Sequence, residues 1–207
     1  MSKKSLIVLS APSGAGKTTI AREILARHPA EVIFSVSATT RPMRAGERDG
    51  ADYYFLTRDK FEDLIHTGAL IEHEEIFGNY YGTPKSEVER AKQMGKRLLF
   101  DIDVKGGLSI RRIFLKESLL IFIAPPDMQT LEARLRTRMT ESDEIIGRRL
   151  ERAQMEMSMM GEYDHIVVND DLERAVGEVE SLIFQFPIPD AQHPKPDSRN
   201  PTPPLSV

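Results

Sequence analysis

The sequence predicts an α/β protein in which helices wrap a parallel β-sheet core. Two observations lead to this prediction: strand-like and helix-like segments alternate along the chain, and several strand-like segments are continuous apolar runs. Such runs are typical of strands that are buried on both faces, as in parallel sheets covered by helices. Parallel strands also need a crossover between them, which the intervening helical segments supply.

The first half of the chain begins with a buried strand and a helix. Ser5–Ser10 (SLIVLS) is a short, continuous apolar run, which is typical of a strand inside a sheet. Lys17–Arg27 has a helical pattern and stops before Pro29, because the residue before a proline is disfavoured in a helix. The next expected elements are strand 32–37, polar loop 39–50, strand 53–56, helix 59–67 closed by Gly68, and extended chain 69–77.

The second half continues the alternation. Gly78–Thr83 is interpreted as a compact turn, and Pro84 suits the first position of a helix. Pro125 and Pro126 close an apolar strand, since proline cannot donate a backbone hydrogen bond to a sheet. The expected elements are helix 84–94, strand 97–102, helix 104–115, strand 119–123, helices 127–139 and 142–160, strand 165–168 and helix 172–186.

A proline-rich segment follows the last expected helix. Seven of the 13 prolines lie within residues 187–207, together with Asp, Ser, Asn and Gln. This composition does not bury enough apolar surface to offset the entropy lost on ordering. We expect a single domain at 1–186 and a disordered tail at 187–207, for which a ligand of a proline-binding partner is the functional alternative.

Composition excludes several classes of protein. The 207 residues are 40% hydrophobic and 29% charged, with a net charge of −4, which is ordinary for a globular protein and gives no overall attraction to nucleic acid or anionic lipid. The lack of cysteine excludes disulfides, thiolate catalysis and Cys-ligated zinc. No apolar run has the length of a membrane span, and Met1–Lys4 leads into the first strand without a signal-peptide cleavage pattern. We therefore expect a cytoplasmic protein that binds neither nucleic acid nor membrane.

The clearest motif joins the first strand to the first helix, in the strand–loop–helix context of a phosphate-binding P-loop. Its residues are Ala11, Pro12, Ser13, Gly14, Ala15, Gly16, Lys17 and Thr18. The glycines let backbone N–H groups turn toward an anion at the positive end of the helix. Lys17 suits the β- and γ-phosphates, and the Thr18 hydroxyl suits Mg²⁺. The strict motif begins with Gly where this chain has Ala11, and the structural alternative is a glycine-rich turn that precedes a helix.

Asp101 and Asp103 are candidates for the other half of a metal site. Asp101 follows the apolar run 98–100 at the carboxyl end of a buried strand, where ligands of open α/β sheets gather. A carboxylate there can hold Mg²⁺ directly or through water. Strand alternation is expected to direct Asp103 to the same side. The structural alternative for both residues is that they end the strand or cap the following helix, because Asp favours N-cap positions.

A second group of polar side chains lies between residues 37 and 83. Two arginines and two tyrosines offer forked cationic donors and neutral O–H donors, which suit a second phosphate group: Arg41, Arg44, Tyr53 and Tyr81. Three others suit the edge of a purine base: Ser37, Glu72 and Thr83. Guanine presents N1–H and N2–H donors beside an O6 acceptor, so a carboxylate matches the donors and a hydroxyl matches O6. Adenine would leave a buried acceptor unpaired.

At this point the chain resembles the bacterial-type guanylate kinases, which are P-loop nucleoside monophosphate kinases. The matching stretches follow the family order over most of residues 5–186: APSGAGKTT, VSATTRPMRAGERDGADYYF, GNYYGT, LLFDID and IVVNDD. The resemblance implies a P-loop parallel β-sheet core wrapped by helices, a small GMP-binding subdomain and a helical lid. The implied boundaries are core 1–36, 89–126 and 156–186, GMP-binding region 37–88, and lid 127–155.

The resemblance also implies a role for each candidate residue. The guanine contacts implied are Ser37, Glu72, Thr83 and Asp103, and the GMP-phosphate contacts are Arg41, Arg44, Tyr53 and Tyr81. The resemblance implies that residues 11–18 bind ATP, the phosphoryl donor, and that Arg134 and Asn169 lie on its adenine side. It also implies that Thr18 and Asp101 bind Mg²⁺. The catalytic groups implied are Lys17, Arg41, Arg138 and Arg149. The family often has glycines where this chain has Thr137 and Met139, which leaves the lid hinges open.

Three alternatives compete with a kinase that converts ATP and GMP to ADP and GDP. The first is another nucleotide or sugar-phosphate kinase with the same loop. The second is a non-catalytic scaffold module of guanylate-kinase type that binds peptides, although such modules typically lose the ATP loop or the lid arginines. The third is a switch GTPase, whose Asn-Lys-x-Asp motif is absent from the sequence. The sequence leaves both a monomer and a weak homodimer open.

Overall fold

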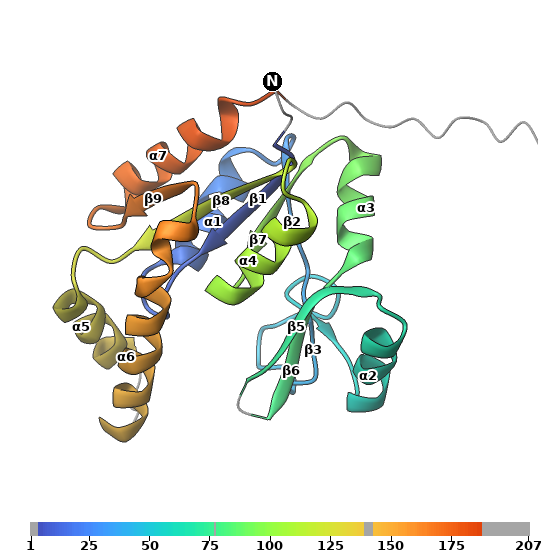
Figure 1. Ribbon diagram of the computed structural model, residues 1–207, viewed down its shortest axis with the longest axis horizontal. Helices are drawn as coiled ribbons and strands as arrows, with labels where there is room; N and C mark the ends of the chain where they lie inside the picture. The colour runs from blue at the N-terminus through green and yellow to red at the C-terminus, as the bar shows by residue number, and fades with distance from the viewer. Residues whose placement is uncertain (1–3, 77, 139–142, 188–207) are drawn as a thin grey trace, which may run out of the picture.

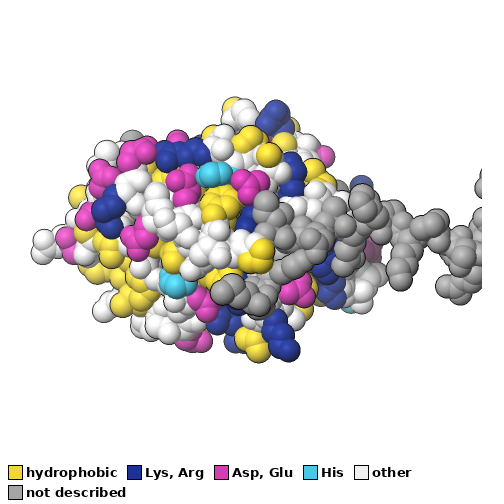
Figure 2. Space-filling model, turned by 90° about the horizontal axis from the view of Figure 1, so that it is seen from above, with side chains coloured by type: hydrophobic (Ala, Val, Ile, Leu, Met, Phe, Trp, Pro, Cys, Tyr) yellow, Lys and Arg dark blue, Asp and Glu magenta, His cyan; other side chains and the backbone are white. Residues whose placement is uncertain are grey.

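The computed structural model describes residues 4–76, 78–138 and 143–187. Apart from Pro187, the predicted disordered tail at 187–207 lies outside the described residues, and so does Met139. Within the described residues, no helix has the length and hydrophobicity needed to cross a membrane. On the face shown in Figure 2, acidic and basic side chains of the described residues are interspersed, in keeping with the small net charge.

The main sheet has five parallel strands in the order β2-β7-β1-β8-β9. Its strands are β1 (Leu6–Ser10), β2 (Val32–Phe34), β7 (Arg97–Asp101), β8 (Ser118–Ala124) and β9 (His165–Val168). The prediction of a parallel α/β core is confirmed. Strand β1 lies at the centre of this sheet, so the loop that follows it lies at the middle of the sheet's carboxyl edge.

Both faces of the main sheet are buried, which explains the continuous apolar runs. On one face, Ile7 and Leu9 of β1 pack with α1 (Lys17–Arg27) and α7 (Leu172–Phe184). On the other face, Leu6 and Val8 pack in a cluster that includes side chains of α3 (Lys85–Met94) and α4 (Val104–Ile113). The alternate residues of one strand thus enter two different cores.

A second, smaller sheet has the order β4-β3-β6-β5. Its strands are β3 (Ala38–Thr39), β4 (Tyr54–Phe55), β5 (Leu70–Ile76) and β6 (Asn79–Pro84). Helix α2 (Arg58–His66) packs on it through Phe61, which is fully buried. The expected compact turn at 78–83 is wrong, because β6 begins at Asn79 and pairs antiparallel with β5. The strand expected at 32–37 ends at Phe34, where the chain leaves the main sheet for the small one.

Two helices extend the molecule on the side opposite the small sheet. They are α5 (Met128–Arg138) and α6 (Asp143–Ser158), and a short 3₁₀ turn, Met160–Glu162, follows α6. Figure 1 shows α5 and α6 on one side and the small sheet on the other, both projecting from the same edge of the main sheet. That edge is where β1, β7 and β8 end, and ligands of open α/β sheets bind outside the carboxyl ends of the strands, so this edge is the place for a site.

A buried carboxylate on α3 fixes the passage between the two sheets. Glu87 is 1% exposed, and it accepts hydrogen bonds from the backbone N–H of Val36 (2.8 Å) and the hydroxyl of Tyr54 (3.1 Å). The same carboxylate receives Nη2 of Arg90 at 2.7 Å, and Arg90 also donates to the carbonyl of Phe34. Glu87 therefore ties the end of β2 to the start of the small sheet.

Replacing Glu87 should destabilise the protein. Glu87→Ala removes the acceptor of three donors, one of them charged, and we expect the free energy of unfolding to fall by about 2–3 kcal/mol. Urea unfolding followed by circular dichroism measures this change. Glu89→Ala is the matched control, because Glu89 lies on the same helix with a 65% exposed side chain paired only to Lys92 in the described contacts. Equal stability of the two variants would contradict the role given to Glu87.

Candidate functional site

The loop between β1 and α1 has the geometry of an anion cradle. Gly14 and Gly16 have φ values of 94° and 95°, which side chains rarely adopt. Gly16 caps α1 with its backbone alone, and the first turn of that helix holds no acidic residue. The N–H groups at this helix end are therefore open to a negatively charged ligand. Ala11, which departs from the strict motif, is 5% exposed and packs its methyl group in the core.

Asn169 braces this loop from behind. Its side-chain Nδ2 donates to the carbonyl of Ala15 at 2.7 Å, and a Cβ at position 16 would lie 2.2 Å from that nitrogen. Only glycine fits at position 16. Nη2 of Arg134 donates to the backbone carbonyl of Asn169 at 3.0 Å, so the two residues expected on the adenine side lie together. The bracing of the loop by Asn169 was not predicted from the sequence.

Lys17 reaches across to the end of β7. Its Nζ lies 2.5 Å from Oδ1 of Asp101 and 2.6 Å from the carbonyl oxygen of Ile102. Thr18, on the first turn of α1, is exposed. The Asp101 carboxylate and the Thr18 hydroxyl are hard oxygen donors at the mouth of the loop, and this donor set fits Mg²⁺. Among the described residues, no group of three or more Asp, Glu or His side chains could hold a metal ion.

Asp103 has the helix-cap role that the sequence left open as its structural alternative. Strand β7 ends at Asp101, and Asp103 is the N-cap of α4, where its carboxylate accepts from the N–H of Gly106 at 3.0 Å. The alternation argument is therefore wrong, because the chain has already left the strand. Burial raises the pKa of Glu72, and the negative charge of Asp103 adds to this effect.

The small sheet brings three of the four predicted phosphate-binding side chains into one cluster. Cζ of Arg41 lies 5.4 Å from the ring centroid of Tyr53, and the ring centroids of Tyr53 and Tyr81 are 6.3 Å apart. Burial, followed by the charge of Asp101, raises the pKa of Tyr53, so its hydroxyl stays a neutral donor. Arg44 is exposed at the rim of this cluster.

Glu47 belongs to this cluster and was missed by the sequence analysis. Its carboxylate receives Nη2 and Nη1 of Arg41 at 2.7 and 3.0 Å and the backbone N–H of Arg44 at 2.7 Å. The Arg41 guanidinium holds the pKa of Glu47 below its usual range. The Arg41 guanidinium thus donates two hydrogen bonds to one anionic group in this position, as it would to a phosphate. It lies in an irregular loop with no periodic pattern, so the sequence offers no signal for it.

The base-reading candidates meet on the paired strands β5 and β6. Oε1 of Glu72 accepts from the hydroxyl of Thr83 at 2.7 Å, and the two residues are cross-strand partners. Burial raises the pKa of Glu72 to about 7, and the charges of Asp103 and Glu74 add to this effect. Strand β3 pairs with β6 so that Ala38 opposes Gly82, and continuing this register places Ser37 opposite Thr83.

The arginines of α5 and α6 differ in their surroundings. Arg136 and Arg148 form exposed pairs with acidic side chains, as expected for solvated helix surfaces. Arg149 lies one residue further on α6 and is partly exposed. Arg138 is the last residue of α5, and its side chain lies outside the described part of the structure. A further residue, Arg152, pairs with Glu156 and with Glu74 of the small sheet, which the sequence analysis did not predict.

Comparisons with known proteins agree with this geometry. The family model described as guanylate kinase matches residues 3–186. A guanylate kinase from Chlorobaculum tepidum is 53% identical over 87% of this chain and 92% of the relative, and one from Chlorobium chlorochromatii is 54% identical over 87% and 95%. The crystal structure of guanylate kinase from Anaplasma phagocytophilum has a TM-score of 0.70 and 34% identity, covering 88% of this chain and 86% of that one. This chain belongs to the guanylate kinase family.

Proposed function

We propose that this protein transfers the γ-phosphoryl group of ATP to GMP, forming ADP and GDP in the recycling of purine nucleotides. One observation carries the proposal: the small sheet lies against the end of β7, because a Cβ at Gly106, in the first turn of the helix that follows β7, would lie 3.3 Å from Oε2 of Glu72 on β5. Because Asp101, at the end of β7, contacts Lys17 of the glycine loop, two anion-binding sites adjoin each other. Two neighbouring phosphate sites suit a transfer between two phosphates better than hydrolysis of one.

The main sheet supplies the ATP side. The backbone N–H groups of residues 11–18 and the Lys17 ammonium hold the β- and γ-phosphates. Arg134 and Asn169, which are joined by a hydrogen bond, lie on the adenine side. Thr18 and Asp101 would hold Mg²⁺, which when bound neutralises charge on the phosphate oxygens. In the structure Lys17 is paired with Asp101, so a phosphate must take the place of this carboxylate as the partner of Lys17.

The small sheet supplies the GMP side. Its phosphate is held by guanidinium and phenol donors from Arg41, Arg44, Tyr53 and Tyr81. Its base is read by Glu72, which accepts N1–H and N2–H, with Ser37, Thr83 and Asp103 around it. The Thr83 hydroxyl already orients the Glu72 carboxylate. A site of this kind disfavours adenine, because adenine has no N1–H or N2–H group to donate to the Glu72 carboxylate.

The reaction needs alignment and charge neutralisation rather than covalent help. An oxygen of the GMP phosphate attacks the γ-phosphorus of ATP in line, the bond from that phosphorus to the bridging oxygen breaks, and ADP leaves with the bond electrons. The attacking oxygen is already anionic, so no general base is required. Lys17, Arg41 and the arginines of α5 and α6, Arg138 and Arg149, neutralise the charge that builds between the phosphates. Closure of the segment 127–155 over the site would exclude water and prevent hydrolysis of ATP.

A panel of acceptors tests this function. ADP release is measured with ATP and each of GMP, dGMP, AMP, CMP and UMP. We expect turnover with GMP and at least about 10²-fold lower kcat/KM with AMP, because the Glu72 acceptor is unpaired against adenine. A preference for another acceptor would favour a different nucleotide or sugar-phosphate kinase, and no turnover with any acceptor would favour a peptide-binding scaffold.

A further inference from the structure

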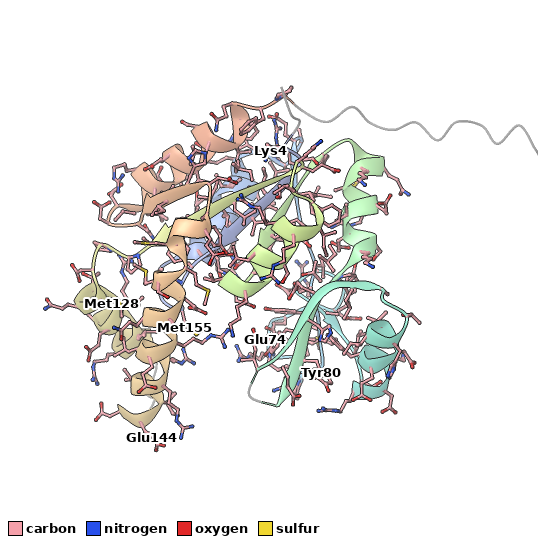
Figure 3. The ribbon with its side chains drawn as sticks, in the orientation of Figure 1. Lys4, Glu74, Tyr80, Met128, Glu144 and Met155 are labelled. Carbon is pink, nitrogen blue, oxygen red and sulfur yellow. The ribbon has the colours of Figure 1, made fainter. Side chains whose placement is uncertain are left out.

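One ion pair joins the helical projection to the small sheet. Nη2 of Arg152, on α6, lies 3.4 Å from Oε2 of Glu74, on β5, across 78 residues of sequence. The two side chains are 34% and 30% exposed, so water only partly screens the pair. Figure 3 shows Glu74 on the side of the small sheet that faces α6. This contact bridges the two projections that enclose the site.

The Glu74 end of the pair lies within the GMP side. Glu72 and Glu74 are two residues apart on β5, so both point to the same face of the sheet. Glu74 is the cross-strand partner of Tyr81, and Glu72 is the partner of Thr83. Glu74 therefore lies opposite Tyr81, which is proposed to hold the phosphate, and two residues from Glu72, which is proposed to read the base.

The Arg152 end of the pair lies beside the ATP side. Arg149 and Arg152 are three residues apart on α6 and share one face of the helix. A second carboxylate fixes the guanidinium, because Nε of Arg152 donates to Oε1 of Glu156 at 3.0 Å and Glu156 is 6% exposed. A displacement of Arg152 along with Glu74 would thus move the helix that carries Arg149.

We propose that the Arg152–Glu74 pair couples the two nucleotide sites, so that occupation of the GMP site favours the position of α6 that completes the ATP site. Both are positioning residues that act through Arg149 and Glu72. The inference rests on the proposed function. Since coupling is reciprocal, a bound adenine nucleotide must raise the affinity for GMP by the same factor. A partly exposed ion pair supports a coupling of about two- to fivefold.

Calorimetry measures this coupling without turnover. The Kd of GMP is determined with the full-length protein alone and with saturating MgADP, a pair of ligands that cannot react, and the ratio of the two values is the coupling factor. We expect Glu74→Gln to reduce this factor by about two- to fivefold. Glu75→Gln is the matched control, because Glu75 is the next residue on β5, points to the opposite face and lies 3.8 Å from Arg58 instead. We expect it to keep the wild-type coupling.

A double-mutant cycle separates coupling from a purely structural role. Arg152→Gln should lower the coupling factor as Glu74→Gln does, and combining the two should give no further loss. Arg152→Gln also removes the partner of the buried Glu156, so the melting temperature of this variant is measured in parallel. If Arg152→Gln is unfolded, the coupling factor of Glu74→Gln alone tests the inference. The inference is overturned if Glu74→Gln has the same coupling factor as the wild-type protein. It is also overturned if the coupling factor of the wild-type protein is one, because the two sites are then not coupled. Wild-type protein that fails to phosphorylate GMP would instead refute the proposed function.

Discussion

Lys17→Ala should lower kcat for GDP formation by about 10²- to 10³-fold, the loss typical of removing one group that stabilises transition-state charge. Lys17 begins α1 at the glycine loop, and its Nζ points to the carboxyl edge of the main sheet, where it contacts Asp101 and Ile102. No other side chain of the loop carries a positive charge. Steady-state assays with ATP and GMP measure the effect.

The affinity for GMP provides the control for this variant. Lys17 lies on the ATP side, so calorimetry should give a Kd for GMP alone close to the wild-type value. Loss of Lys17 also leaves Asp101, whose side chain is 11% exposed, without its cation, so the melting temperature is measured in parallel. A folded Lys17→Ala variant with kcat within threefold of wild type would refute the role of the loop.

Glu72→Gln should weaken the binding of GMP by about 10²-fold. The substitution replaces one carboxylate oxygen with an NH₂ group, which faces a donor of guanine, and removes the charge that strengthens both hydrogen bonds. The Kd of ATP should stay unchanged, because Glu72 lies on the small sheet at the partner strand of Thr83. Calorimetry with each nucleotide separates the two effects, and an unchanged GMP affinity would show that another group reads the base.

The affinity for GMP should also depend on the ionisation of Glu72. Burial raises the pKa of this side chain to about 7, so the proton is mostly bound at pH 6 and mostly lost at pH 8. The donors of guanine require the carboxylate, and GMP should therefore bind about tenfold more tightly at pH 8 than at pH 6. The second ionisation of the GMP phosphate, near pH 6, also changes the affinity with pH, and it does so equally in the wild-type protein and in Glu72→Gln. Subtracting the Glu72→Gln profile isolates Glu72, and identical profiles would contradict the assignment.

The main sheet could be predicted from the sequence because each of its strands is buried on both faces. Burial of this kind leaves continuous apolar runs, as in β1 and β8, whose observed bounds differ from those expected by one residue at each end or less. Helices between them leave their own periodic pattern and stop signals. Local sequence and tertiary structure agree in this part of the chain.

The small sheet was harder to predict because long-range pairing defines it. Strands β3 and β4 have two residues each and exist only by pairing with each other and with β6. Strand β6 contains Asn, Gly and two Tyr, so the composition indicated a turn. One face of this sheet carries the polar residues of the site, and these conceal the hydrophobic alternation of a half-buried strand.

The sequence offered two kinds of signal for the site. The loop at 11–18 has the spacing of a known motif, whereas the arginines and tyrosines of residues 41–81 were proposed from their side-chain chemistry and from the family resemblance. The residues that hold these groups in place have no such signal. Glu47 accepts hydrogen bonds from Arg41, Asn169 donates to the carbonyl of Ala15, and Arg152 contacts Glu74 from a helix distant in sequence. A carboxylate or an amide in a loop acquires such a role only from tertiary contacts.

Simultaneous binding of both nucleotides is the decisive test for two separate phosphate sites. The protein is saturated with Mg²⁺ and a non-hydrolysable ATP analogue, and GMP is then titrated in a calorimeter. We expect one GMP to bind per chain at an affinity equal to or tighter than that of the free protein, with the analogue retained. Release of the analogue in step with GMP binding would refute two separate sites, because it would mean that one site serves both phosphates.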